Sequence, residues 1–327
     1  MSTETKIQSG IRGLAFGDAF SAQNAIHRLN LVGSRRVRRL QKLNATASQM
    51  RHTTRPEPYV NSYSTSLIAP RPSDDCEWFY FAHNVASSKL SFAEEWLKLS
   101  RERHNILARA GTHAALRNIA NGKSAPHSGH DNTHYFDSIS LIHAVAIASV
   151  KELTPSEIHA LLIEDISWTH SEDGIWCAQA LAETTIQLRK GVSRGEAIDA
   201  GLSFLPVDSW SHREVLRAMK LSEEVVNHFE RVSVLEERFV DRIYAFPYGA
   251  PETLALLLSH INHFSAPELF FASSFLHKRH MDSLPPLMGF FAGLLGGKEW
   301  IPMQFRENPI VLDGVCIPQL KGYSLIS

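Results

Sequence analysis

Two acidic segments that lie far apart in the chain could together bind a cation. The first, Ser73-Asp74-Asp75-Cys76, directly precedes a helical stretch. The second, His280-Met281-Asp282-Ser283, precedes the apolar stretch Leu284-Pro285-Pro286-Leu287-Met288-Gly289. Carboxylate and hydroxyl oxygens are hard ligands that suit Mg²⁺ or Mn²⁺. We therefore predict that two helix starts face each other across a shared divalent cation.

Each segment alone also has a simpler interpretation. Asp and Ser are preferred at the N-caps of helices, where a side-chain oxygen accepts a hydrogen bond from the first turn. If the motifs are only caps, the chain is an unrelated helical interaction module. Asp74, Asp75 and Asp282 would then lie far apart in space. The distance between these residues distinguishes the two interpretations.

Helical signals dominate the elements that must position these residues. Capping sequences begin at Ser91, Thr154 and Ser193, each with Glu three residues later. Helical periodicity covers about 139–150, 171–189, 208–219, 222–236, 251–262 and 266–277. Period-2 patterns are scarce, and strands do not alternate with helices. We therefore predict an all-α fold of roughly ten or more helices.

The length and composition predict one packed domain. The chain has 327 residues, of which 44% are hydrophobic and 20% charged, so a substantial core is expected. We predict a single domain over residues 1–327, with residues 1–9 as a flexible tail. Residues 45–72 and 121–136 are rich in turn-forming residues and are expected to be irregular.

Charge and cysteine content exclude several classes of protein. The formal net charge of −1 gives no support for binding to nucleic acid or to an anionic membrane. The basic run at residues 34–42 is interpreted as a solvated helix face. Cys76, Cys177 and Cys316 have neither zinc-site spacing nor a disulfide framework, which fits a reducing compartment. The apolar stretch 284–295 is too short to span a bilayer. We expect a cytoplasmic protein.

Several short motifs occur in a fixed order along most of the chain. They are Gly-Leu-Ala-Phe-Gly-Asp-Ala at 13–19, Ser-Asp-Asp-Cys at 73–76, Thr169-His170, the segment 278–283, Gly289 with Gly293, and Ile301-Pro302. As an ordered set they resemble the motifs of the ADP-ribosylglycohydrolase family. The specificity of this resemblance lies in the order, because each motif is short.

The resemblance implies a compact, single-domain, orthogonal helix bundle. It also implies two divalent ions, Mg²⁺ or Mn²⁺, between the Asp-rich helix starts. The residues at the positions of metal ligands are Ser73, Asp74, Asp75, His280, Asp282 and Ser283. Asp74 or Asp75 would also orient the attacking water. The residues implied on the substrate side are Gly17, Asp18, Lys278 and Arg279.

The implied activity is metal-dependent removal of ADP-ribose from a protein side chain or a small molecule. Three departures mark the chain as divergent. His280 replaces a carboxylate and suits Mg²⁺ poorly. Lys278-Arg279 replaces two glycines, and Ala25 stands where the family often has Glu. A catalytically impaired protein of the same fold therefore remains the alternative. It would act as an immunity protein or regulator, with an ADP-ribosyltransferase as a possible partner.

Overall fold

The computed structural model describes residues 3–22, 69–241, 249–277 and 279–326. These residues form fifteen α-helices, two short 3₁₀ helices and one two-stranded antiparallel sheet. The prediction of an all-α bundle is confirmed. Among the described residues, no helix combines the length and the apolar character that crossing a membrane requires.

The elements follow one another in a nearly unbroken helical series. They are α1 (Thr3–Ser21), α4 (Asp74–Ser87), α5 (Phe92–Arg101), α6 (Ala110–Ala120), α7 (His127–His130), α8 (Ile139–Ala148), α9 (Pro155–Ile166), α10 (Asp173–Lys190), α11 (Arg194–Leu202), α12 (Trp210–Glu223), α13 (His228–Arg238), α14 (Ala250–Asn262), α15 (Pro267–Ser273), η2 (Ser274–Leu276), α16 (Leu284–Gly296), α17 (Met303–Arg306), β1 (Ile310–Val311), η3 (Pro318–Leu320) and β2 (Ser324–Ile326). Ile310 pairs with Ile326 in the small sheet.

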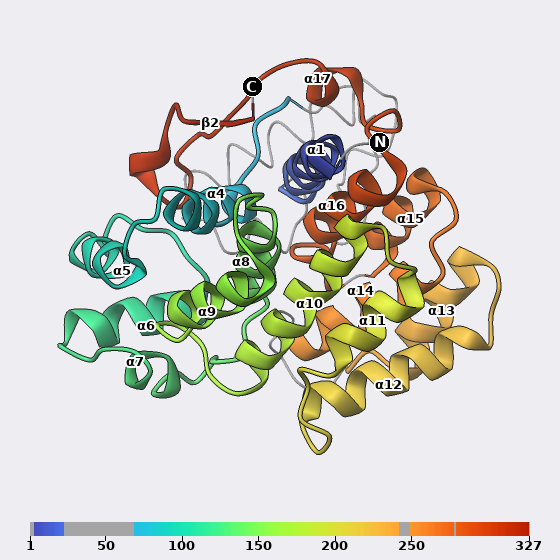
Figure 1. Cartoon of the computed structure of the whole chain (residues 1–327), viewed down its shortest axis with the longest axis horizontal. Coiled ribbons are helices and arrows are strands. Elements are labelled where there is room, and N and C mark those ends of the chain that lie inside the picture. The colour runs from blue at the N-terminus through green and yellow to red at the C-terminus, as the bar shows by residue number, and fades with distance from the viewer. Residues whose placement is uncertain (1–2, 23–68, 242–248, 278, 327) are drawn as a thin grey trace, which may run out of the picture.

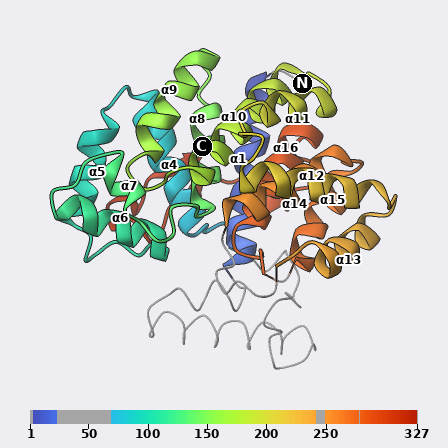
Figure 2. The same ribbon diagram turned by 90° about the horizontal axis from the view of Figure 1, so that it is seen from below.

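The helices gather around a central group. Figure 1 shows α4 to α7 and α9 on one side and α11 to α15 on the other, with α1, α8 and α10 between them. The view from below in Figure 2 shows the same division. One continuous hydrophobic cluster joins the two sides. Because α4 packs against the central helices α1 and α8, the acidic residues at the end of α1 and the start of α4 are buried inside the bundle.

The predicted capping sequences form the expected helix starts. Thr154 and Glu157 make a complete capping box at the start of α9. Ser91 and Ser193 each accept a hydrogen bond from the amide three residues later. Of the predicted irregular segment 121–136, four residues form the single turn α7. Most of the other one, residues 45–68, lies outside the described part of the chain.

Glycines allow α1 and α16 to touch backbone to backbone. A Cβ added to Gly13 would lie 2.0 Å from the carbonyl oxygen of Gly289, and one added to Gly289 would lie 2.1 Å from that of Gly13. Gly293 approaches the carbonyl oxygen of Ser9 in the same way. A four-residue spacing such as that of Gly289 and Gly293 places both glycines on one helix face and is typical of a close helix contact, and the helix that packs there is α1.

The N-terminal segment is not a flexible tail as far as it is described. Residues 3–9, expected to be flexible, form the first turns of α1, where Ile7 and Ser9 are buried. The prediction was wrong because the segment lacks a strong amphipathic pattern. Its order depends instead on packing against α16, which sequence periodicity does not reveal.

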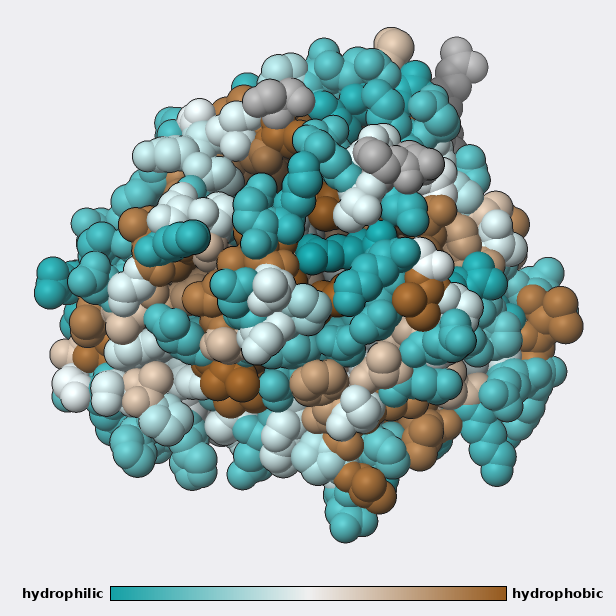
Figure 3. Space-filling view, viewed as in Figure 1, coloured by the Kyte–Doolittle hydropathy of each residue, from teal (hydrophilic) through white to brown (hydrophobic). Residues whose placement is uncertain are grey.

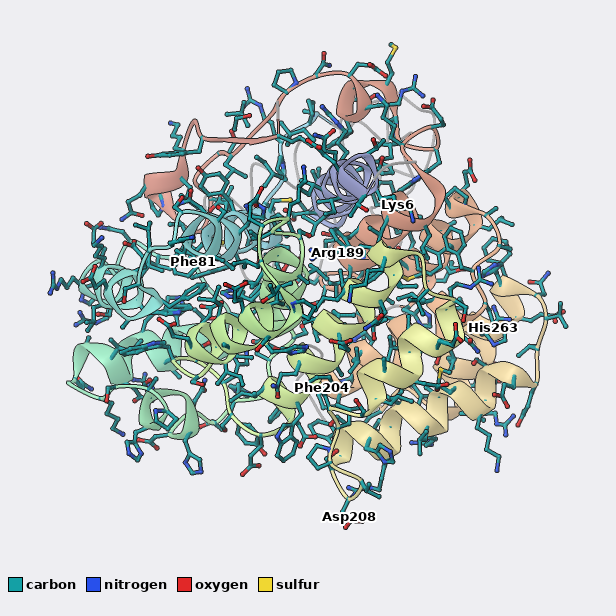
Figure 4. All side chains as sticks on the ribbon, in the orientation of Figure 1. Lys6, Phe81, Arg189, Phe204, Asp208 and His263 are labelled. Carbon is teal, nitrogen blue, oxygen red and sulfur yellow. The ribbon has the colours of Figure 1, made fainter. Side chains whose placement is uncertain are left out.

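A polar surface encloses this core. The face in Figure 3 is mostly hydrophilic, with apolar side chains scattered over it rather than gathered in one broad patch. Inside, buried polar groups join helices. Arg189 on α10 donates hydrogen bonds to the carbonyl oxygens of Ala148 and Val150, at the end of α8 (Figure 4). These bonds satisfy carbonyl groups that the end of a helix leaves without partners.

Glu77 on α4 fastens the C-terminal segment, which crosses over α1 toward α4 in Figure 1. Its carboxylate accepts hydrogen bonds from the amides of Val315, Cys316 and Ile317. Burial raises the pKa of Glu77 to about 7, although the three amides oppose that rise. The carboxylate therefore provides partners for the amides of residues 315–317, which lie between β1 and η3.

Replacing Glu77 by Gln should loosen this segment, because an amide oxygen cannot accept all three bonds. We expect faster hydrogen exchange over residues 310–326 and a loss of about 1–3 kcal/mol in the free energy of unfolding. Mass-spectrometric hydrogen exchange measures the first and urea denaturation the second. Glu237→Gln, an exposed position on α13, should change neither. Unchanged exchange in the Glu77 variant would show that these bonds do not hold the segment.

Candidate functional site

Asp18, near the end of α1, positions the start of α4. Its Oδ2 atom accepts hydrogen bonds from the amides of Ser73, at 2.7 Å, and Cys76, at 3.0 Å. Amides in the first turn of a helix have no partner within the helix, so a carboxylate there stabilises it. The α1–α16 glycine contact thus fixes Asp18, and Asp18 in turn fixes the direction of α4.

This arrangement brings three carboxylates together. Asp18, Asp74 and Asp75 are buried and offer oxygen atoms that all lie within 4.8 Å of one another. Asp75 is fully buried, and its Oδ2 atom has no hydrogen-bond partner among the described residues. A buried carboxylate oxygen without a donor is unfavourable unless a cation or a proton compensates it. The trio therefore has the composition of a cation site.

Arg109, which directly precedes α6, lies at the centre of the wider cluster. Its Nη2 atom is 2.9 Å from Asp75 Oδ1 and 3.2 Å from Asp282 Oδ2. The guanidinium is also 3.5 Å from Asp137 Oδ1, through Nη1, and 3.9 Å from Asp74 Oδ2, through Nε. The two acidic helix starts therefore meet on a single nitrogen atom. The interpretation as separated caps is excluded.

Two serine hydroxyls complete the contacts of Arg109. Its Nη1 atom donates to Oγ of Ser138 and to Oγ of Ser283, each at 3.0 Å, and the two hydroxyls are 2.8 Å apart. Ser138 precedes α8 and Ser283 precedes α16. A third helix start thus joins the two that the sequence indicated.

The segment that carries Asp137 is held by His170. The ring Nε2 atom of His170 lies 3.0 Å from the carbonyl oxygen of Asp137, and its Nδ1 atom lies 2.7 Å from Thr169 Oγ1. Burial lowers the pKa of His170 to about 3, and repulsion from His143 and Arg109 adds to this effect. A neutral ring that donates from Nε2 fits both contacts. His170 is thus a positioning residue for the third helix start.

This histidine should make stability sensitive to acid. Below the unfolded-state value of about 6.5, the unfolded chain binds a proton at His170 that the folded protein does not bind until about pH 3. Stability is therefore lost as the pH falls through this window, by about 1.4 kcal/mol per pH unit. His170→Gln should reduce the dependence of the free energy of unfolding on pH by about 1.4 kcal/mol per pH unit, which corresponds to one proton. Urea denaturation at pH 7, 6, 5 and 4 measures it, and equal slopes in the two proteins would contradict the assignment.

The cluster carries more negative than positive charge. Its buried carboxylates are those of Asp18, Asp74, Asp75, Asp137 and Asp282. Burial raises the pKa of Asp75 well above its ordinary value, Arg109 opposes this, and the neighbouring carboxylates add to it. Burial likewise raises the pKa of Asp137 to about 6, against the pull of Arg109. One guanidinium does not balance five carboxylates, so a further cation or bound protons would stabilise the site.

Comparison with known proteins agrees with this geometry. The sequence matches the ADP-ribosylglycohydrolase family over residues 1–311. The chain belongs to that family. One solved structure, described as an ADP-ribosylglycohydrolase-related protein complex, covers 93% of this chain and 92% of its own, at 17% identity and a TM-score of 0.51. At that identity the likeness shows the fold alone. No curated protein sequence matches the chain.

Other residues at ADP-ribosylglycohydrolase motif positions lie elsewhere. His280, predicted as a metal ligand, is not in the converging trio found among the described residues. Its Nε2 atom lies 3.4 Å from Glu252 Oε2 and its Nδ1 atom 3.4 Å from Thr253 Oγ1, both on α14. Burial favours a higher pKa for Glu252, but His280, the amide of Asp241 and Arg279 together outweigh it and the pKa is lowered. The substitution thus gives His280 a partner in α14.

The residues predicted to contact the substrate differ in their surroundings, and not all of them are described. Gly17 packs against Pro285, where an added Cβ would lie 2.2 Å from the carbonyl oxygen, and this contact accounts for the glycine. Arg279 is half-buried, and its charge helps to lower the pKa of Glu252. Lys278 and Ala25 lie outside the described residues.

Sequence reasoning missed Arg109, Asp137 and Ser138. The last two had a usable signal, because Asp137-Ser138 repeats the pair Asp282-Ser283 directly before a helix. Arg109 had none. It lies in the sequence Leu-Ala-Arg-Ala, and only the fold brings its side chain to the carboxylates.

Proposed function

We propose that this ADP-ribosylglycohydrolase family member hydrolyses a glycosidic bond between ADP-ribose and a protein side chain or small molecule, with the help of Mg²⁺ or Mn²⁺. The observation that carries the proposal is the convergence of Asp75 and Asp282 on one buried centre. The family motifs imply that these two segments share the metal site, and a protein using them only as caps would have no reason to bring them together.

The residues present fit one divalent cation. Asp18, Asp74 and Asp75 supply converging hard oxygen atoms, and the Oδ2 atom of Asp75 is buried without a donor among the described residues. The excess of carboxylates favours a doubly charged ion over a monovalent one. When bound, such an ion lowers the pKa of a coordinated water.

The protein's own groups have separable roles in this proposal. Asp74 is the most exposed carboxylate around Arg109, at 13% of its side chain, so it is proposed to meet substrate and water at the mouth of the site. Asp75 is proposed to orient the attacking water and to accept its proton. Ribose hydroxyls would donate hydrogen bonds to these carboxylates. Ser73 remains a proposed metal ligand, and Lys278 and Arg279 remain proposed contacts to the substrate.

Release of free ADP-ribose is the direct test. The purified protein is incubated with arginine-linked and serine-linked ADP-ribosyl peptides and with a small-molecule ADP-ribose ester, and products are measured by mass spectrometry. We expect release from at least one linkage with Mg²⁺ or Mn²⁺, and loss of release with EDTA. No release from any linkage with either metal would contradict hydrolysis.

The second candidate is a catalytically impaired binding protein of the same fold. The position of Arg109 favours it, because a guanidinium among the carboxylates occupies space that a fully active two-ion site would need. Calorimetry with ADP-ribose separates the two candidates. Binding without release from any substrate would support an immunity protein or regulator, and a pull-down with an ADP-ribosyltransferase would then identify a partner.

A further inference from the structure

We infer that Arg109 is a built-in cation that takes the place of one of two metal ions, so that the protein binds a single divalent ion per chain. This inference rests on the proposed metal-dependent function, because it specifies the occupancy of the same site. It concerns the chain's own arginine, and its test measures metal binding rather than turnover.

A metal ion and Arg109 would compete for the same space beside Asp282. Mg²⁺ lies about 2.0–2.1 Å from its oxygen ligands. Asp282 Oδ2 and Ser283 Oγ, which sit at ligand positions of the family motif, are instead 3.2 Å and 3.0 Å from nitrogen atoms of Arg109. The first is an ion-pair distance and the second is a hydrogen-bond distance. A metal ion and the guanidinium cannot both occupy the space beside Asp282.

Several contacts hold Arg109 in this position. Its side chain is 4% exposed and bonded to both serines and to Asp75. The chain before it is held by the hydrogen bond from the amide of Leu107 to the carbonyl oxygen of Cys316. A residue held from several sides does not leave the centre by a simple rotamer change.

Arg109 also supplies a positive charge to the cluster of carboxylates. An arginine side chain is not deprotonated in proteins, and the nitrogen atoms of Arg109 lie within 3.9 Å of oxygen atoms of four carboxylates. The side chain therefore keeps one positive charge at every physiological pH. It offsets part of the carboxylate repulsion that a metal ion would otherwise offset.

Asp75 connects the arginine to the remaining cation position. Its Oδ1 atom bonds Arg109, while its Oδ2 atom is buried with no hydrogen-bond partner among the described residues. Asp75 also belongs to the trio with Asp18 and Asp74. The same carboxylate would therefore help to hold an ion while it pairs with the guanidinium. The inference thus assigns the Asp18–Asp74–Asp75 side to metal and the Asp137–Asp282 side to Arg109.

Manganese stoichiometry tests this inference. Protein stripped with EDTA is titrated with MnCl₂, and free Mn²⁺ is followed by electron paramagnetic resonance. The wild-type protein should bind one Mn²⁺ per chain, and Arg109→Ala should bind two, because the variant vacates the second position. Arg109→Lys should still bind one. Arg189→Ala, which removes another buried arginine far along the chain, should also bind one.

Asp282→Asn gives a second test that does not depend on Arg109→Ala folding. If Asp282 pairs with the guanidinium of Arg109 and does not bind metal, this variant should still bind one Mn²⁺, with an affinity within about threefold of the wild-type value. If Asp282 is a metal ligand, the affinity should fall by tenfold or more. Two ions bound to the wild-type protein, none bound to it, or a tenfold loss in Asp282→Asn would each overturn the inference. If the wild-type chain binds one ion but releases no ADP-ribose, the inference about Arg109 holds and only the proposed hydrolysis is refuted.

Discussion

Asp75→Asn is expected to lower the rate of ADP-ribose release at least about 100-fold. The side chain is fully buried, contacts Arg109 through Oδ1, and belongs to the trio of carboxylates at the proposed cation site. An amide is neutral, binds Mg²⁺ weakly and cannot accept a proton from water. Rates measured by mass spectrometry at saturating metal would show the loss.

Although Asp75→Asn should lose activity, its stability without metal should be close to that of the wild-type protein. Burial raises the pKa of Asp75, so its charged form opposes folding, and the neutral amide removes that cost. Without metal, the melting temperature of Asp75→Asn should therefore not fall far below that of the wild-type protein. With Mn²⁺, only the wild-type melting temperature should rise. Asp208→Asn, an exposed position labelled in Figure 4, is the matched control and should match the wild-type protein in both assays. Full activity of Asp75→Asn would remove this residue from the mechanism.

Gly289→Ala should destabilise the protein by about 3 kcal/mol or more. The added methyl group would lie 2.1 Å from the carbonyl oxygen of Gly13, so α1 and α16 would have to move apart and lose the packing between them. Since α1 carries Asp18, the variant should also bind Mn²⁺ more weakly. Urea denaturation and the manganese titration measure these two effects.

Gly195→Ala is the matched control for the glycine contact. Gly195 lies in α11, and an added Cβ there meets nothing within 4 Å. Alanine in a helix favours folding over glycine, so this variant should be more stable than the wild-type protein by up to about 1 kcal/mol. A similar small gain in Gly289→Ala would mean that α1 and α16 do not touch as described.

The parts of the fold that depend on local chemistry could be predicted from the sequence. The capping box at Thr154 acts within one turn of helix, so four neighbouring residues suffice to recognise it. The spacing of Gly289 and Gly293 likewise indicated a close helix contact, although not which helix would supply it. Residues 3–9 were misjudged because their order comes from contacts with α16 rather than from their own pattern.

The candidate site could be predicted only in part, for the same reason. Asp74, Asp75 and Asp282 were recognisable because they belong to ordered motifs at helix starts. Arg109 was not, because its role depends on carboxylates from three other segments. His280 was assigned to the metal from its position in the motif, but Glu252 on α14 is its nearest charged partner. Position in a motif fixes the backbone better than it fixes the side-chain contacts.

Anomalous diffraction from crystals soaked in MnCl₂ would test most directly whether the distant acidic segments form a metal centre. We predict one manganese peak in contact with Asp74 and Asp75, with Arg109 still paired with Asp282. Strong manganese peaks elsewhere and none at these carboxylates would contradict it.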